Sequence, residues 1–332
     1  MELVDLQAQG SHPDLGPDGK LACTGCPAVY PLTGGTARML RPEALAELQG
    51  NEVKARTAES FAYEWEHFGA LRDEWRKNFL DYMQPLPESW FAGRLVLDVG
   101  AGSGRHAFHA AALGARVVAV DLGRSIDVAR RHLPNEVLTV QADAEALPFA
   151  RESFDIVMSV GVLHHLPRPE PAFQSIVRFA RPGGRVQIYL YWVPFRRSHR
   201  FVLRWVSAVR RLTTRLPHPL MRALAYPLAA LLYVTCVVPY RLMRRWRHLA
   251  RIADVFPLKT YGDYPFKVLV NDQFDRFAAP LEHRYTAPEV EGWLERAGLE
   301  DTAVLPHNGW IGAGRRPYTE RSNSASAGAQ RG

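Results

Sequence analysis

The sequence has little cysteine and no leader-like beginning. Only three cysteines, Cys23, Cys26 and Cys236, occur among 332 residues, which is too few for a disulfide framework and is typical of a reducing compartment. The first residues, MELVDLQAQGSHPD, contain no basic stretch followed by an apolar one, so we expect no signal peptide and a cytoplasmic protein. A hydrophobic content of 47% is enough for a substantial core and excludes an intrinsically disordered chain.

Acidic residues are missing from one long segment. None occurs between Glu170 and Asp254, whereas arginine recurs throughout this segment. The chain as a whole carries a formal net charge of +7. Such a bias predicts an anionic partner, which is a nucleic acid, a membrane surface or an acidic substrate. Charge alone does not choose among the three.

Short apolar runs alternate with longer amphipathic segments from Leu95 onward. The runs are LVLDVG, RVVAVD, VLTVQAD, FDIVMSVGV and RVQIYLYW. Such alternation is typical of parallel strands joined by helices, so it predicts an α/β fold with a doubly wound sheet that is covered on both faces. Near the end of the chain, residues 285–316 predict one more helix followed by two strands.

The first apolar run ends in a glycine-rich turn. Gly100, Gly102 and Gly104 stand at every second position, and bare backbone between a strand and a helix lets a ligand approach the free N–H groups of the helix. Dinucleotide-binding folds use the pattern G-x-G-x-x-G. Arg105 stands where the third glycine of that pattern belongs, so the turn fits a dinucleotide poorly.

Three aspartates accompany the first three runs. Asp98 comes two residues before the glycine turn, where a carboxylate would repel a pyrophosphate but attract an ammonium or sulfonium group. Asp121 ends the second run, where a carboxylate accepts hydrogen bonds from ribose hydroxyls, and Asp143 follows the third run and could accept one from an adenine amino group. A single such aspartate often only caps the next helix. Three in order predict a cationic adenosine ligand, which S-adenosylmethionine is.

At these residues the sequence resembles the class I S-adenosylmethionine-dependent methyltransferases, in particular the branch that methylates quinones and other small molecules. The matching stretches are VLDVGAGSGRHA, VVAVDLGRSIDVAR, VLTVQADAEALPF, FDIVMSVGVLHHLPRPEPAF and RFARPGGRV, and the match resumes at YTAPEVEGWLERAGLED. The resemblance implies the Rossmann-like fold of this class, with a helical insertion before the last helix and strands. It also implies S-adenosylmethionine as the cofactor.

The resemblance implies cofactor contacts at ten positions. They are Asp98, Gly100, Gly102, Gly104, Asp121, Leu122, Asp143, Ala144, Val160 and Gly161. Within this set, Asp98 would lie near the amino group of the cofactor, Gly100 and Gly102 beside its methionine part, and Asp121 at the ribose. Leu122 would flank the adenine, Asp143 with Ala144 would read the adenine edge, and Val160 and Gly161 would lie beneath the cofactor.

Methyl transfer from a sulfonium requires alignment of the two partners and exclusion of water, and it requires no metal. A hydroxyl acceptor would benefit from a general base, for which His164 and His165 are candidates, although LHHL is common in the resembling family and a cofactor-side or structural role is equally open. Tyr63 and Trp65 are candidate residues of a helical lid over the substrate pocket, with ordinary packing as the alternative. Asn271 and Asp272 are candidates for orienting the acceptor, with a solvated loop as the alternative.

Cys23 and Cys26 resemble the second half of a zinc-ribbon module that precedes some methyltransferases. A structural zinc ion needs four ligands, but the residues about fifteen positions upstream contain no second CxxC pair, and only His12 and scattered acids could replace it. We therefore expect a remnant that binds no metal.

The stretch ALAYPLAALLYVTCVVPY, residues 223–240, is uncharged and is flanked by arginine-rich segments. A membrane-spanning helix needs about 20 apolar residues, and Pro227 and Pro239 interrupt this one. In one interpretation, helices of the insertion cap the substrate pocket and their arginines face water. In the other, residues 195–251 lie on an anionic membrane surface and admit a lipid-like or lipid-linked acceptor.

These observations predict six segments. They are a zinc-ribbon-like remnant (1–50), a helical lid (51–94), the cofactor-binding core (95–194), the basic and apolar insertion (195–284), the C-terminal helix and strands (285–316) and a disordered tail (317–332). The predicted function is transfer of a methyl group to a small or lipophilic acceptor, at oxygen. The alternative is an rRNA or tRNA methyltransferase, but the basic segment lacks lysine and has an apolar centre, which disfavours a nucleic acid partner. A protein that only senses the cofactor has no sequence feature in its favour.

Overall fold

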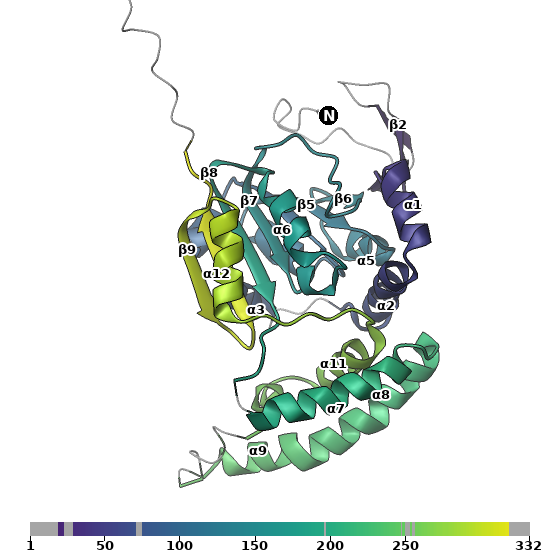
Figure 1. The fold of residues 1–332 in the computed structure, drawn as a ribbon, viewed down its shortest axis with the longest axis vertical. Helices are drawn as coiled ribbons and strands as arrows, with labels where there is room; N and C mark the ends of the chain where they lie inside the picture. Colours follow the sequence, from purple (N-terminus) through teal and green to yellow (C-terminus); the bar gives the residue numbers. More distant parts are fainter. Residues whose placement is uncertain are drawn as a thin grey trace, which may run out of the picture.

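The computed structural model describes residues 19–22, 29–70, 75–195, 197–246, 248–249, 253 and 256–318. The strands of the described chain are β1(Gly19–Ala22), β2(Val29–Thr33), β3(Thr36–Arg38), β4(Leu95–Val99), β5(Arg116–Asp121), β6(Leu138–Gln141), β7(Phe154–Val160), β8(Ala180–Leu190), β9(Glu300–Pro306) and β10(Trp310–Arg315). They form one sheet with the order β1-β2-β3-β6-β5-β4-β7-β8-β10-β9 (Figure 1).

The central strands of this sheet are parallel. From β4 the chain proceeds through β5 and β6 on one side, and it then returns to β7 and β8 on the other side. β10 runs antiparallel to β8. The sheet order therefore reverses between β4 and β7, and in doubly wound sheets ligands bind outside the carboxyl ends of the strands at such a reversal. This arrangement confirms the predicted Rossmann-like α/β fold, including the C-terminal helix and strand pair.

The N-terminal strands continue the same sheet, because β3 pairs in parallel with β6. Cys23 and Cys26 lie outside the described residues, as do His12 and most of the C-terminal tail. The zinc-ribbon-like remnant expected in residues 1–50 therefore stays a prediction, and so does the disorder expected at 317–332.

The helices of the described chain are α1(Pro42–Gly50), α2(Glu52–Phe68), α3(Trp75–Tyr82), α4(Arg105–Ala112), α5(Ser125–His132), α6(Pro169–Val177), α7(Arg197–Thr213), α8(His218–Leu232), α9(Val238–Met243), α11(Phe266–Ala278) and α12(Ala287–Arg296), with shorter turns at η1(Glu88–Trp90), η2(Leu163–His165), η3(Tyr233–Val237) and η4(Lys259–Gly262). Some of them cover the two faces of the sheet. α6 and α12 pack on one face through Phe173, Trp293 and their neighbours. α3, α4 and α5 pack on the other face through Phe79, Ala107 and Ile126.

The insertion forms a helical layer of its own beside the sheet (Figure 1). Its core joins Met221, Ala225 and Ala229 of α8 to Leu269 and Phe274 of α11. The turn η3 is π-helical and ends two residues before Pro239, so it contains Thr235, the residue four positions before the proline. Proline has no N–H and its ring clashes with the carbonyl of residue i−4, so a locally wider turn lets the helix pass this position.

Candidate functional site

The glycine turn between β4 and α4 has a backbone that only glycine tolerates well. Gly100, Gly102 and Gly104 have φ angles of +81°, +56° and +86°. A Cβ atom on Gly100 would lie 2.3 Å from Val162 Cγ2, and one on Gly102 would lie 2.6 Å from Trp65 Nε1. The glycines thus combine left-handed backbone conformations with close approach of neighbouring side chains.

A cavity lies at the carboxyl ends of β4, β5, β6 and β7. Its lining from the sheet and its loops includes Val99, Gly100, Ala101, Gly102, Ser103, Arg105, His106, Val120, Asp121, Leu122, Ala142, Asp143, Ala144, Val160, Gly161, Val162, His165 and Leu166. Eight of the ten predicted cofactor residues are therefore brought together around one space. The exceptions are Asp98, which lies beneath the glycine turn, and Gly104, whose bare backbone accommodates the side chain of Leu133.

One face of α2 closes this cavity. Lys54, Thr57, Ala58, Phe61 and Trp65 all line it, and their spacing of three or four residues places them on the same side of the helix. Only Trp65 of these was a predicted site residue. Helical periodicity starting from Trp65 is the sequence signal that would have identified the other four.

The carboxylate of Asp121 holds the glycine turn in place. Its Oδ2 atom accepts a hydrogen bond of 2.9 Å from Gly102 N, and its Oδ1 atom accepts 3.0 Å bonds from Gly123 N and from the hydroxyl of Ser125. Burial raises the pKa of Asp121, although these three donors act in the opposite direction. The backbone N–H of Leu122 acts in the same direction, so the carboxylate is held in place from several sides and still lines the cavity.

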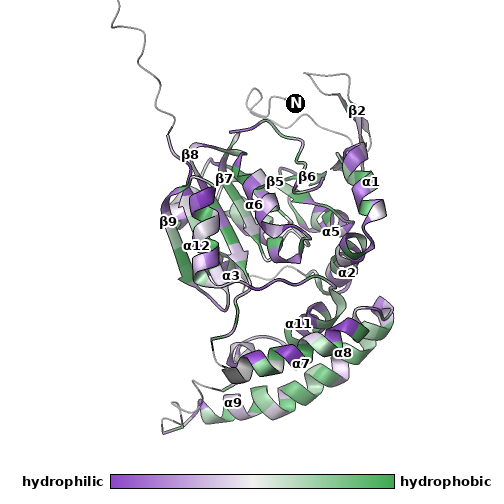
Figure 2. Cartoon of the chain, in the orientation of Figure 1, coloured by the Kyte–Doolittle hydropathy of each residue, from purple (hydrophilic) through white to green (hydrophobic). Residues whose placement is uncertain are grey.

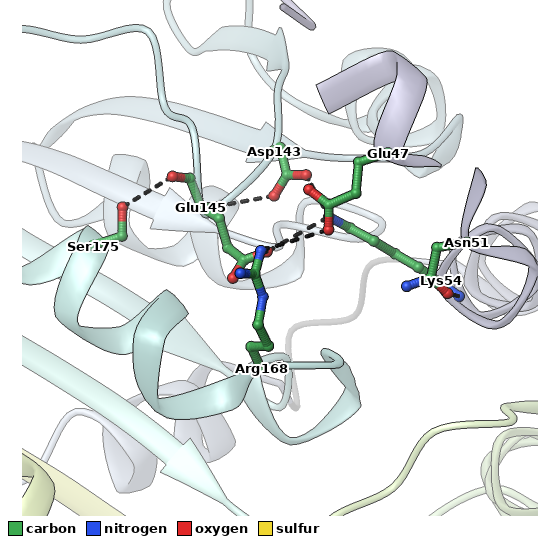
Figure 3. Close-up of polar contacts among 7 residues, drawn as sticks. All are labelled: Glu47, Asn51, Lys54, Asp143, Glu145, Arg168 and Ser175. Atoms are coloured by element: carbon green, nitrogen blue, oxygen red, sulfur yellow. Dashed lines mark hydrogen bonds and ion pairs between the residues drawn. The ribbon is translucent and has the colours of Figure 1, made fainter. Parts of the chain in front are cut away.

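Asp143, at the other end of the cavity, is paired with a buried lysine (Figure 3). Lys54 Nζ donates to Asp143 Oδ2 at 2.6 Å, and the two side chains are only 2% and 3% exposed. Glu47 and Glu145 lie 3.3 and 3.7 Å from the same ammonium group. Burial by itself would lower the pKa of Lys54, but the hydrogen bond and charge of Asp143 and the charges of both glutamates raise it.

Asp98 is a buried carboxylate that forms no ion pair within the described residues. It is 1% exposed, and the backbone N–H of Ala107 and the charge of Arg105 offset its burial only in part. Burial, followed by the negative charge of Asp121, raises the pKa of Asp98 to about 7. A cationic group bound above the glycine turn would supply the missing positive charge.

The two adjacent histidines of η2 have different environments. His165 lines the cavity and its Nδ1 atom lies 2.6 Å from the carbonyl oxygen of Leu281. Since a carbonyl can only accept, Nδ1 carries the proton and Nε2 carries the lone pair. Burial lowers the pKa of His165 to about 4, so the ring is neutral near pH 7.

His164 is completely buried outside the cavity. Its ring centroid lies 4.0 Å from that of Tyr191, and the ring faces the backbone of Tyr189 rather than the cavity. Burial lowers the pKa of His164 well below its usual value. Of the two predicted base candidates, the structure therefore gives only His165 access to a ligand in the cavity.

A second cavity adjoins the first on the side of α11. Trp65, Ser103 and Arg105 line both cavities, and Asn271 and Asp272 line the second one. The remaining lining residues are His67, Phe68, Ala70, Trp75, Lys267 and Val268. The guanidinium carbon of Arg105 lies 6.0 and 5.0 Å from the ring centroids of Trp65 and Trp75. From the sequence alone, Arg105 is identified only as the residue that replaces the third glycine of the dinucleotide pattern.

Tyr63 lies outside both cavities. Its ring stacks on His67, His218 and Phe274 at centroid distances of 4.1, 5.4 and 5.5 Å. Tyr63 and Trp65 are two residues apart, which is about 200° around a helix. Because Trp65 faces the cavity, Tyr63 must face the insertion. The prediction of Tyr63 as a pocket residue is therefore corrected: Tyr63 is a packing residue.

Comparison with known proteins places this site in a methyltransferase domain. Residues 97–188 match the methyltransferase domain family. The chain is 32% identical over 135 residues to the ubiquinone biosynthesis O-methyltransferase of Stutzerimonas stutzeri, across 36% of this chain and 58% of that relative. It is 27% identical over 183 residues to the tRNA (carboxymethyluridine(34)-5-O)-methyltransferase of Macaca fascicularis, across 52% of this chain and 26% of that relative.

Among solved structures, human N-acetylserotonin methyltransferase in complex with S-adenosylmethionine is 14% identical, with a TM-score of 0.47, over 81% of this chain and 60% of that chain. The chain thus spans less than two thirds of the length of each of these three proteins.

Proposed function

We propose that this chain, whose residues 97–188 form a methyltransferase domain, transfers a methyl group from S-adenosylmethionine to an oxygen atom of a small, lipophilic acceptor. The observation that carries the proposal is the first cavity, in which the glycine turn, Asp121 and Asp143 surround one space at the carboxyl ends of the parallel strands. The matching relative from ubiquinone biosynthesis supports a quinone-like acceptor and oxygen as the methylated atom.

The residues around the first cavity fit a cationic nucleoside. The buried carboxylate of Asp98, whose pKa is raised by burial, favours a positive charge at the glycine turn, whereas a pyrophosphate would add negative charge beside a buried acid. The carboxylate of Asp121, which lines the cavity, suits a ribose hydroxyl. These features distinguish the site from one for a dinucleotide.

The bound cofactor supplies a methyl group that is already activated on a sulfonium. Gly100 and Gly102 would contact its methionine part, Asp121 its ribose, and Asp143 with Ala144 its adenine. α2 shields the cavity from water through Phe61 and Trp65. This leaves alignment of the acceptor as the main task of the protein.

The second cavity supplies the space and the groups for an acceptor. Phe68, Trp75 and Val268 offer apolar contacts, while Asn271 and Asp272 offer hydrogen bonds to fix its orientation. His165, which lines the first cavity, keeps Nε2 unprotonated and would accept the proton of an acceptor hydroxyl that reaches into that cavity.

The proposal is tested by calorimetry with S-adenosylhomocysteine and by incubation with labelled cofactor and separate lipid, small-metabolite and RNA extracts. We expect heat from adenosylhomocysteine and label in the lipid or small-metabolite fraction. Label in RNA alone would favour the alternative of an RNA methyltransferase. Heat from NADH without any from adenosylhomocysteine would reject the proposal.

Two glycine variants make this test specific to the site. Gly100→Ala introduces a Cβ that collides with Val162, and we expect adenosylhomocysteine affinity to fall at least about ten-fold. Gly298→Ala is the matched control, because Gly298 has a similar φ of +66° but no atom within 4 Å of the added Cβ. The control carries the same backbone strain and should retain the affinity.

A further inference from the structure

Exposed apolar side chains are concentrated on the insertion. Thirteen of the seventeen large apolar or aromatic side chains that are exposed in the described chain lie between Phe195 and Phe266. Figure 2 shows α8 and α9, along the outer edge of the helical layer, mostly in the hydrophobic colour. A concentration of exposed apolar side chains on one part of a folded protein marks an interaction site.

On α7 the exposed apolar residues form a single stripe. Phe201, Trp205 and Leu212 are 61%, 63% and 69% exposed, and their spacing of four and seven residues places them on one side of the helix. Arg204 and Arg211 each precede a member of this stripe and are also exposed. Neither arginine forms an ion pair within the described part of the chain. The stripe is therefore bordered by uncompensated positive charge.

On α8 one side is packed and another is bare. Met221, Ala225 and Ala229 are buried against α11, whereas Leu224 and Leu231 are 44% and 60% exposed. Burial of these exposed leucines against an apolar surface or an apolar medium would therefore be favourable.

The continuous helical run His218–Met243 is long and apolar enough to cross a membrane. It has 26 residues, and its most apolar 18-residue window has a mean hydropathy of 1.7 but is only 22% buried. A core helix of a globular domain would be mostly buried. Spanning a bilayer, however, would pull Met221, Ala225 and Ala229 out of their packing with α11. In the membrane interface, the buried side of the helix can keep its packing with α11 while the exposed side contacts lipid.

Charge identifies the anionic bilayer as the occupant of this surface. No acidic residue lies between Glu170 and Asp254, so a second copy of the chain in a two-fold contact would place arginines against arginines. RNA would be attracted by the arginines but would leave the apolar stripes uncovered. In an anionic bilayer, lipid acyl chains cover the apolar side chains and the headgroups pair with the arginines.

We propose that α7 and the run α8–α9 form a membrane-docking face that lies on the surface of an anionic bilayer. The apolar stripes enter the acyl boundary, and Arg204, Arg211 and their neighbours contact the lipid phosphates. α8 packs on α11, which also supplies Asn271 and Asp272 to the second cavity, so one helix layer separates the bilayer from that cavity. It follows that the acceptor enters from the membrane. This consequence rests on the proposed function, whereas membrane docking does not.

The test is cosedimentation of the full chain with vesicles of phosphatidylglycerol or of phosphatidylcholine alone. We expect binding to the anionic vesicles that weakens with added salt, and little binding to the zwitterionic ones. Arg204→Gln with Arg211→Gln should lose roughly five-fold in partitioning per arginine. Trp205→Glu with Leu212→Glu should lose at least about ten-fold, because two anchors are replaced by anions.

The control is Leu45→Glu, which places a glutamate on an exposed leucine of α1, at a distance from the insertion (Figure 1). It should bind vesicles as the unaltered chain does. Circular dichroism and adenosylhomocysteine calorimetry on each variant separate loss of docking from loss of folding or of the cofactor site.

Three outcomes would overturn the proposal. The first is an unaltered chain that stays in the supernatant with both vesicle types. The second is a dimer in sedimentation equilibrium that Trp205→Glu dissociates, without vesicle binding. The third is binding that resists alkaline carbonate, which would indicate a spanning helix.

Discussion

Lys54 on α2 and Asp143 after β6 form a buried ion pair with an Nζ to Oδ2 distance of 2.6 Å (Figure 3). The two residues are 89 positions apart in the chain. Their pairing fixes the lid helix over the end of the cavity that the proposed function gives to the adenine. The remaining acceptor capacity of Asp143 is limited further by Glu145 N, which donates to its Oδ1 at 3.0 Å.

Replacing Lys54 by methionine should destabilise the fold by about 3 kcal/mol, because removal of one partner of a buried pair leaves an uncompensated charge. The measurement is urea unfolding at pH 7. Lys77→Met is the matched control, since Lys77 is 85% exposed in its pair with Asp81 and should change the free energy of unfolding by less than about 0.5 kcal/mol. Equal losses in the two variants would contradict a special role for the buried pair.

Asp98 should make the stability of the ligand-free protein fall as pH rises. Its pKa of about 7 in the folded state lies above the ordinary 3.8, so between these values the folded state binds more protons than the unfolded state. The contribution is present below pH 4 and is lost progressively up to pH 7, by an amount on the order of 2 to 4 kcal/mol. Asp98→Asn should remove this slope, whereas Asp263→Asn, at an exposed position, should retain it.

The same carboxylate should make cofactor affinity depend on pH in the opposite direction. The ammonium group of adenosylhomocysteine favours the charged form of Asp98, so this ligand should bind more tightly at pH 8 than at pH 6 and should release protons on binding. Calorimetry in buffers of different ionisation enthalpy measures this release. An affinity that does not change between these pH values would rule out charge compensation by Asp98.

His165 should act as a base without titrating near neutrality. Since its pKa is about 4, its neutral form predominates above pH 5, and kcat for a hydroxyl acceptor should be flat from pH 6 to 8 and should decline below about pH 5. His165→Gln should reduce kcat about 100-fold. His164→Gln, next to it but outside the cavity, should affect stability more than kcat, and an equal kcat loss in both variants would argue against the assignment.

Burial of the His165 ring also predicts a stability effect. Its pKa in the folded state lies below the ordinary 6.5, so the unfolded state binds more protons between pH 4 and 6.5. Stability contributed by this group is present above pH 6.5 and is lost as the pH falls toward 4. In the His165→Gln variant, the free energy of unfolding should lack this decrease between pH 6.5 and pH 4.

Arg210 should fix α7 to the segment that follows α11. Its guanidinium pairs with Glu282 and also donates to the carbonyl of Ala279 at 2.8 Å. Burial would raise the pKa of Glu282, but Arg210 and Arg284 outweigh it and hold that pKa below its usual value. Arg210→Met should cost about 3 kcal/mol in urea unfolding. Arg211→Met, at the exposed neighbouring position, should have little effect on folding and provides the control.

Local patterns in the sequence determined the sheet, the glycine turn and the ends of the strands. An apolar run that ends at Asp98 or Asp121 and a turn with glycine at alternate positions are short-range signals, because strand alternation and left-handed φ angles depend on a few adjacent residues. The same patterns brought eight predicted cofactor residues to one cavity.

Only the tertiary structure decided which side chains meet across the chain. It paired Lys54 with Asp143, gave His165 rather than His164 access to the cavity, and turned Tyr63 away from it while Trp65 faces it. The sequence contains each of these residues, but their contacts depend on how α2 and η2 rotate against the sheet. That rotation is set by the packing of the whole helical layer, which no local periodicity encodes.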